Sequence, residues 1–233
     1  MTARVIVDRN EWLEARIALL EKEKDFTKAR EVLAAERRQM PWVKVEAGYA
    51  FDGADGKETL GDLFGGKSQL IVQHFMLGDG WEAGCPSCSF WADGYEGIDV
   101  HLAKRDIAFV TISNAPLDQI DAYRKRMRWS FKWVSSHGTT FNRDYHVSFT
   151  EAEKDTGLYN FANGGFPATE APGASVFVKD ETGAVFHTYS CYARGLDMLN
   201  VGYQYMDLTP MGRNEQDLPH TMAWLRRHDE YEG

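Results

Sequence analysis

The sequence contains few cysteines and fewer basic than acidic residues. Only three of its 233 residues are cysteine, too few for the disulfide framework of a small secreted domain. Lys and Arg total 26 against 35 Asp and Glu, which gives a formal net charge of −9 at pH 7. An acidic surface repels a phosphate backbone and an anionic bilayer. We therefore expect neither a nucleic acid nor a membrane as partner.

The sequence also lacks long apolar runs. None approaches the length of a membrane span, and residues 1–11 carry Arg4, Asp8 and Arg9 where a signal peptide would be apolar. Hydrophobic residues still make up 43% of the chain and aromatic residues 13%, enough for a full core. We expect a cytoplasmic globular protein, in which a reducing environment keeps cysteines available for chemistry.

Residues 1–40 are predicted to form a helical arm. Apolar residues recur at helical spacing in two stretches, and Asp25 between them is placed to cap a second helix. The apolar residues are Leu13, Ile17 and Leu20, followed by Phe26, Ala29 and Leu33. The pattern therefore predicts two amphipathic helices that end before Pro41.

Strands and helices alternate in the next part of the chain. Apolar runs at 69–77 and 107–112 predict buried strands, and each precedes a segment with helical spacing, at 89–104 and 117–127. Right-handed crossovers would make the two strands parallel, with the chemistry at their carboxyl ends. Weaker patterns predict a strand at 43–51, an edge strand at 131–135, a hairpin of strands 175–179 and 184–190, and a last helix at 218–228.

A cysteine pair, Cys85-Pro86-Ser87-Cys88, lies between the first strand and the first helix. This spacing also occurs in zinc and iron–sulfur sites, but next to a strand-helix-strand pattern it favours a redox pair. Unpaired N–H groups and the helix dipole favour a thiolate at a helix N-terminus. We therefore predict that Cys85 is the nucleophile and Cys88 the resolving thiol.

The pattern predicts an α/β fold of the thioredoxin-like class, with a central mixed β-sheet flanked by helices. Three parts follow: the helical arm at 1–40, the thioredoxin-like domain at 41–200, and a C-terminal extension at 201–233 packed on the same domain. Side chains near the pair are predicted to shape a substrate pocket. These are Trp81, Pro86, Ser87, Trp91, Asp93, Tyr189 and Arg194.

A metal site is the alternative. Cys85, Cys88 and His187 together would form a soft ligand set for copper or zinc, and Cys191 could add a third sulfur. No phosphate loop or nucleotide fingerprint occurs, so we expect no organic cofactor. The expected partner is a thiol or disulfide substrate, either a small molecule or a protein. A homodimer is an additional possibility that the sequence leaves open.

Several segments carry a resemblance to a known family. They include Leu63-Phe64-Gly65-Gly66, His74-Phe75-Met76, Gly84-Cys85-Pro86-Ser87-Cys88-Ser89-Phe90-Trp91-Ala92-Asp93 and Tyr192-Ala193-Arg194-Gly195. Through these segments, which are spread over nearly the whole chain, the sequence resembles the bacterial DUF899 family of thioredoxin-like proteins. The resemblance implies the fold and the thiol site, but no substrate.

A looser similarity to peroxiredoxin-like proteins is visible around Phe51-Asp52-Gly53 and Gly65-Gly66-Lys67. The chain departs from thioredoxins at one position. Thioredoxins place a cis-proline directly before the strand that faces the thiols, whereas Pro172 lies three residues before the predicted strand start at Ser175.

Overall fold

The structure is a computed structural model that describes residues 5–232. Contacts divide the chain into two compact units, Met1–Pro41 and Trp42–Gly233, and each is described by itself. Within residues 5–232, no helix combines the length and the apolar character needed to cross a membrane.

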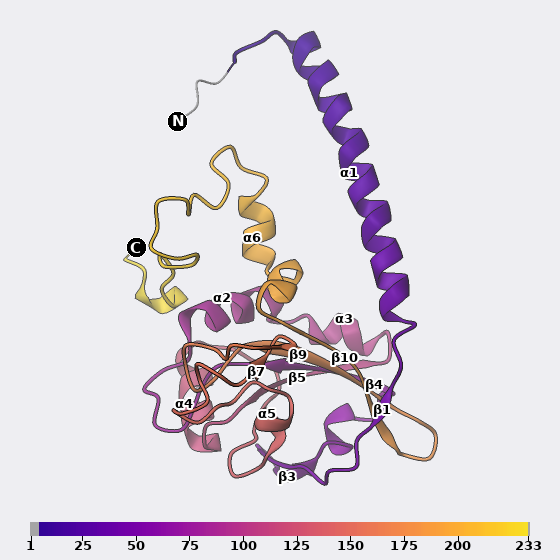
Figure 1. The fold of residues 1–233 in the computed structure, drawn as a ribbon, viewed down its shortest axis with the longest axis vertical. Coiled ribbons are helices and arrows are strands. Elements are labelled where there is room, and N and C mark those ends of the chain that lie inside the picture. Colours follow the sequence, from indigo (N-terminus) through magenta and orange to yellow (C-terminus); the bar gives the residue numbers. More distant parts are fainter. Residues whose placement is uncertain (1–4, 233) are drawn as a thin grey trace. The chain divides into compact units, whose positions relative to one another are not determined.

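The first unit contains a single long helix, α1 (Arg9–Arg37), drawn in indigo in Figure 1. The prediction of two helices was wrong. Asp8 caps the helix by accepting hydrogen bonds from the N–H groups of Asn10 and Glu11. Asp25 lies inside the helix and pairs with Lys28 one turn later, at 3.1 Å. No Gly or Pro interrupts the stretch, so the helix continues past the position where a second cap was expected.

The second unit is built on an eight-stranded sheet with the order β1-β10-β9-β4-β5-β6-β2-β3. A separate hairpin pairs β7 (Leu158–Tyr159) with β8 (Ala162–Asn163). The strands of the sheet are β1 (Val43–Lys44), β2 (Ala50–Gly53), β3 (Gly56–Thr59), β4 (Gln69–His74), β5 (Ile107–Ser113), β6 (Trp133–Ser135), β9 (Gly173–Lys179) and β10 (Val185–Tyr192).

The helices of this unit are short. They are α2 (Pro86–Tyr95), α3 (Asp99–Ala103), α4 (Leu117–Arg126), α5 (Phe141–Asp144) and α6 (Val201–Met206), with 3₁₀ turns η1 (Asp62–Phe64), η2 (Ala193–Leu199) and η3 (His228–Glu230). In Figure 1, α2 and α6 lie on the same side of the sheet, with the C-terminal segment (yellow) beside them.

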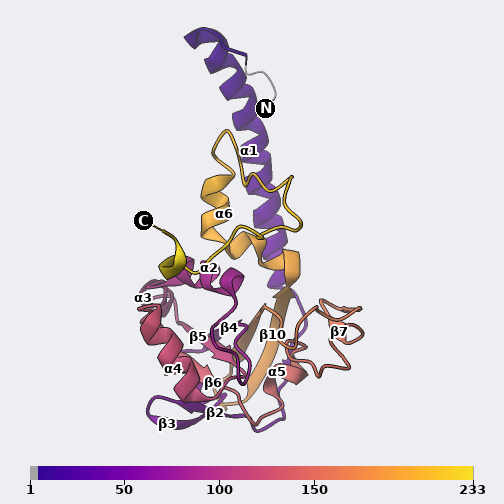
Figure 2. The same ribbon diagram turned by 90° about the vertical axis from the view of Figure 1, so that its left-hand side faces the viewer.

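Strand directions identify the fold. β4 runs parallel to β5 and antiparallel to β9, which forms a hairpin with β10. A parallel strand-helix-strand unit with an antiparallel hairpin beside its first strand is the arrangement expected of a thioredoxin-like domain, so the predicted fold class is confirmed. Figure 2 shows β4 and β5 next to each other in the sheet, and β9 lies between β4 and β10.

The two faces of the sheet carry separate cores. Side chains alternate along each strand, so Val134 packs in one core and its neighbour Trp133 in the other. The first core centres on Leu70, Val72, Ile112, Phe141 and Phe177. The second contains Phe75, Cys88, Ile120, Tyr123 and Trp129, and it is the one that supports the thiols.

Three local predictions need correction. The helix at 89–104 is two helices, α2 and α3, because Gly97 adopts a left-handed φ of 77° between them. The predicted edge strand at 131–135 is β6, which lies inside the sheet between β5 and β2. The predicted helix at 218–228 does not form.

Local hydrogen bonds replace that last helix. Glu215 Oε1 accepts from the Met222 N–H at 2.9 Å and from Trp224 Nε1 at 2.7 Å. Met222 itself has a left-handed φ of 68°, which no α-helix contains. A carboxylate that binds backbone and side-chain donors nearby holds this segment in turns.

Candidate thiol site

The cysteine pair lies where β4 gives way to α2. Cys85 is the N-cap residue of α2, and Pro86 occupies the first helical position, where a missing N–H costs nothing. The Cys85 N–H donates to the Met76 carbonyl at 3.0 Å, which ties the start of the helix to the chain after β4. Cys85 is half-buried and Cys88 is buried, with both thiols free.

The surroundings of Cys85 favour its thiolate. A hydrogen bond from the Cys88 thiol, helped by the backbone N–H groups of Cys88 and Ser87, lowers the pKa of Cys85 to about 6 despite its burial. The same hydrogen bond and burial raise the pKa of Cys88. The two thiols therefore differ in role at neutral pH: Cys85 is the anion and Cys88 keeps its proton.

Residues around Cys85 hold the backbone on either side of it in place. Ser89 Oγ donates to the Cys85 carbonyl at 2.8 Å, and Arg227 Nε donates to the Gly84 carbonyl at 2.9 Å. A Cβ at Gly84 would lie 2.6 Å from ring atoms of both Phe75 and Tyr123. Only glycine fits there. The second core and the C-terminal segment together therefore determine where the chain enters α2.

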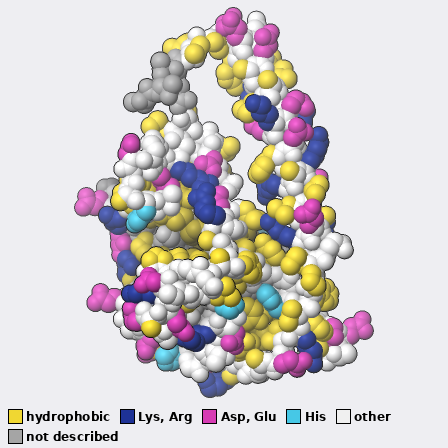
Figure 3. Space-filling model, in the orientation of Figure 1, with side chains coloured by type: hydrophobic (Ala, Val, Ile, Leu, Met, Phe, Trp, Pro, Cys, Tyr) yellow, Lys and Arg dark blue, Asp and Glu magenta, His cyan; other side chains and the backbone are white. Residues whose placement is uncertain are grey.

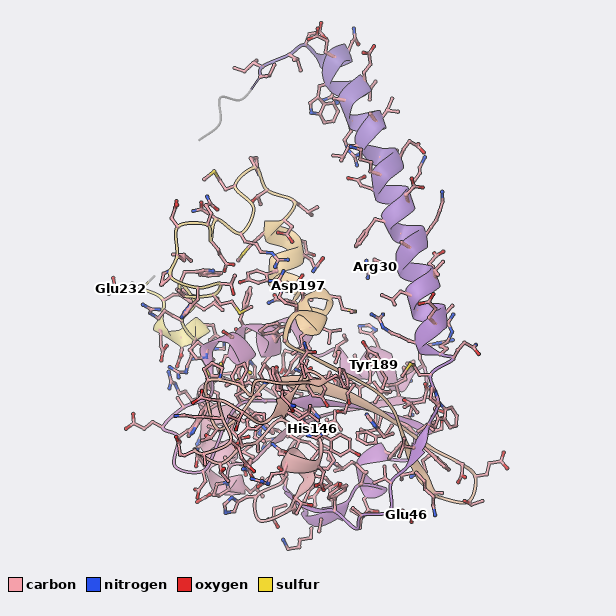
Figure 4. The ribbon with its side chains drawn as sticks, viewed as in Figure 1. Arg30, Glu46, His146, Tyr189, Asp197 and Glu232 are labelled. Atoms are coloured by element: carbon pink, nitrogen blue, oxygen red, sulfur yellow. The ribbon has the colours of Figure 1, made fainter. Side chains whose placement is uncertain are left out.

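The thiols open into a pocket of about 300 Å³ with mainly apolar walls. Its size suits a small ligand. Figure 4 labels one of its residues, Asp197, close to α6. The lining residues are Met76, Cys85, Ser87, Cys88, Trp91, Phe166, Pro172, Ala193, Arg194, Asp197, Tyr203, Thr221 and Met222.

Three of the seven residues predicted to shape the pocket lie in its lining. Ser87, Trp91 and Arg194 join the two cysteines there, although Arg194 comes from a distant part of the chain. Trp91 also donates from Nε1 to the Leu196 carbonyl at 3.2 Å, which links α2 to η2.

The other four predicted residues lie outside the lining. Pro86 starts α2, and Trp81 faces a different surface depression beside Arg126 and Arg227. Asp93 accepts a hydrogen bond from Trp129 Nε1 at 2.9 Å and pairs with His228 at 2.7 Å.

Tyr189, labelled on β10 in Figure 4, packs with the buried residues Cys191 and Leu196. Cys191 therefore belongs to a small core beside Trp91 and is not in the pocket lining.

The predicted metal ligands do not come together. His187 Nε2 bonds to Ser190 Oγ at 2.7 Å, and its ring contacts Tyr145 and Phe177, which belong to the first core. The cysteines are on the other face of the sheet. Among residues 5–232, no group of three His, Cys, Asp or Glu side chains is placed to hold a metal ion.

Pro172 lies closer to the thioredoxin pattern than the sequence indicates. β9 begins at Gly173 and not at Ser175, so Pro172 directly precedes the strand and lines the pocket with Cys85. In the described part of the chain no peptide bond is cis, so the position matches the pattern and the isomer does not.

No sequence pattern pointed to most of the remaining lining residues. Phe166 belongs to the segment around β7 and β8, and Tyr203, Thr221 and Met222 belong to the C-terminal extension. Each is far from the cysteines in the sequence and lies in a region without clear periodicity. Only the motif around Arg194 pointed to this part of the chain.

Comparisons with known proteins agree with the family resemblance. Three similar solved structures are the peroxidoxin BcpB from Mycobacterium tuberculosis (15% identity, 72% of this chain and 97% of that one, TM-score 0.47), a variant of peroxiredoxin Q from Xanthomonas campestris (12%, 71% and 98%, 0.47) and a yeast mitochondrial 1-Cys peroxiredoxin (13%, 71% and 78%, 0.40). The strand order, and not these distant likenesses, identifies the fold.

No curated protein matches the chain. The family described as "Bacterial protein of unknown function (DUF899)" matches residues 1–231. The match covers both units and the thiol motif, and the chain belongs to the DUF899 family.

Proposed function

We propose that the protein is a thiol oxidoreductase in which Cys85 attacks and Cys88 resolves. The observation that carries this proposal is the unequal pair at the start of α2: the pKa of Cys85 is lowered and that of Cys88 is raised by the same contact. A nucleophilic thiolate next to a protonated partner is what two-step thiol exchange requires.

The steps balance for a disulfide substrate. The Cys85 thiolate bonds to one substrate sulfur, the substrate S–S bond breaks, and one thiolate leaves. Cys88 then loses its proton and attacks the Cys85 sulfur, which forms the Cys85–Cys88 disulfide and releases the second thiolate. The substrate gains two electrons, and an external dithiol returns the pair to its reduced form.

The test is a redox titration of the protein with quantitative trapping of thiols. We expect a two-electron transition of Cys85 and Cys88 between about −180 and −270 mV, read by intact mass after alkylation across a graded dithiol buffer. Cys191→Ser is the matched control and should keep the transition. Cys88→Ser should stop at a mixed disulfide on Cys85. Two thiols that stay reduced over the whole range would overturn the proposal.

A reducing compartment such as the cytoplasm fits this activity, because the resting state would have free thiols. We therefore include a cytoplasmic location in the proposal. The substrate would be a thiol or disulfide compound, and a homodimer stays a prediction that sedimentation of the purified chain can test.

A further inference from the structure

The pocket over the thiols is assembled from distant parts of the chain. Met76, Cys85 and Cys88 line it together with residues from two later segments, which are Ala193, Arg194, Asp197 and Tyr203, and Thr221 and Met222. Cys85 thus lies in the wall of a pocket built from several segments. A volume of about 300 Å³ suits a small organic molecule better than the disulfide loop of a folded protein.

The walls of the pocket favour an apolar ligand with a ring. Trp91, Phe166, Pro172 and Met222 all line it, and flat aromatic groups pack well against rings and thioethers. Apart from the Cys85 thiolate, the charged side chains of the lining are Arg194 and Asp197, so an uncharged aromatic group fits the apolar walls next to Cys85.

Among residues 5–232, one cation of the lining has its ion-pair partner only at the limit of contact distance. Arg194 is exposed, with its side chain 77% accessible, and reaches Asp197 only at 4.0 Å. Asp197 already accepts two hydrogen bonds from Arg213, at 2.6 and 3.0 Å, and Arg213 lies 4.0 Å over the Tyr203 ring. Figure 3 shows basic side chains near α6 with an apolar area directly below them.

The backbone before Arg194 is held in an unusual conformation. Ala193 has a left-handed φ of 46°, which is disfavoured for a residue with a Cβ. Its N–H donates to Tyr159 Oη at 3.0 Å, so the position is fixed by a buried aromatic residue. Strain of this kind gathers at ligand-binding positions.

We propose that the pocket binds a small aromatic disulfide that carries an anionic group, with the ring against Trp91 and the anion on Arg194. This substrate class rests on the proposed function, because it assigns Cys85 as the attacking atom. The Cys85 thiolate displaces one aromatic thiolate, and Cys88 gives up its proton and displaces the second. The aromatic disulfide takes up two electrons from the thiol pair.

The experiment compares two aromatic disulfide probes of similar size. Reduced protein is mixed in a stopped-flow instrument with 5,5′-dithiobis(2-nitrobenzoate), which is anionic, or with 4,4′-dithiodipyridine, which is neutral. Arg194→Gln should slow the anionic probe about three- to fivefold and leave the neutral probe unchanged, as expected for an exposed charge interaction. The loss should shrink at high salt.

Arg105→Gln is the matched control, because it removes the same charge. Arg105 precedes β5 and lies at the end of the parallel strands that is away from the thiols. It should slow neither probe. Equal effects of Arg194→Gln and Arg105→Gln on the anionic probe would overturn the proposed substrate class, as would reduction of insulin disulfides as fast as the small probes.

A variant at the nucleophile separates this proposal from the proposed function. Cys85→Ser should abolish the rapid reaction with both probes. If Cys85→Ser still reacts rapidly, the proposed function itself falls. If it does not, and Arg194→Gln behaves as wild type, only the substrate class is wrong.

Discussion

The hydrogen bond between the two thiols can be tested by removing its donor. Contact with the Cys88 thiol is the largest cause of the low pKa of Cys85, and two backbone N–H groups contribute less. Cys88→Ala removes the first and keeps the second, so the pKa of Cys85 should rise. Cys88→Ser retains an O–H donor and should restore part of the shift.

The size of the effect follows from the thiolate fraction. With a pKa of about 6, roughly nine-tenths of Cys85 is ionised at pH 7. An ordinary cysteine, with a pKa of about 8.5, is ionised to only about 3% at that pH. Complete loss of the shift would therefore lower reactivity at pH 7 roughly 30-fold. Because the backbone donors remain, we expect about a 10-fold loss in Cys88→Ala.

The assay is the rate of alkylation by iodoacetamide as a function of pH, followed by peptide mass spectrometry at Cys85. The wild-type rate should rise with a midpoint near pH 6, and the Cys88→Ala midpoint should be higher. Cys191→Ala is the control and should keep the wild-type midpoint, since Cys191 lies outside the pocket lining. A wild-type midpoint near 8.5, or an unchanged midpoint in Cys88→Ala, would refute the reasoning.

Two further predictions concern stability. Gly84→Ala should lower the free energy of unfolding by about 1 to 3 kcal/mol in urea melts, because its Cβ would overlap the Phe75 and Tyr123 rings. Gly48→Ala is the control and should not produce this loss, since nothing lies within 4 Å of its Cβ and its φ is not left-handed. Burial raises the pKa of Glu170 in the folded protein to about 7. The free energy of unfolding should therefore be highest below pH 4.5, where Glu170 is neutral in both states, and should fall by up to about 3 kcal/mol as the pH rises to 7. Glu170→Gln should flatten that pH dependence, and an equal slope in both proteins would contradict it.

The central part of the fold is predictable because its signals are local. The apolar runs that become β4 and β5 are buried on both faces, and a buried parallel strand needs no alternation. The hairpin of β9 and β10 is marked by its turn, where Asp180 Oδ1 accepts from the N–H groups of Thr182 and Ala184. Each of these signals depends on neighbours in the sequence.

Errors occur where the deciding contact is distant or where a single backbone angle matters. A helical spacing was present at 218–228, but hydrogen bonds to Glu215 and the left-handed Met222 hold turns there. The placement of β6 inside the sheet depends on its pairing with β2, about eighty residues earlier in the chain. Spacing within a segment carries no information about such pairings.

The candidate site also has a part that local sequence signals predict and a part that depends on distant contacts. The thiol pair and its place at a helix start could be predicted because Cys85, Pro86 and Cys88 lie within one helical turn, which itself supplies donors that stabilise a thiolate; the nucleophilic role of Cys85 stays a prediction. The substrate pocket could not, because its outer wall comes from a segment more than a hundred residues later.

Under the proposed function, that wall would make the chemistry selective. A bare thiol pair at a helix N-terminus would react with any accessible disulfide, including those of proteins. Here Tyr203 and Met222 line the pocket together with Cys85, and Arg194 adds one exposed charge. The two proposals together assign reactivity to α2 and selectivity to the C-terminal segment. Substitutions in the two regions should therefore change different kinetic quantities: the pH midpoint of Cys85 in the first case and the ratio of rates between probes in the second.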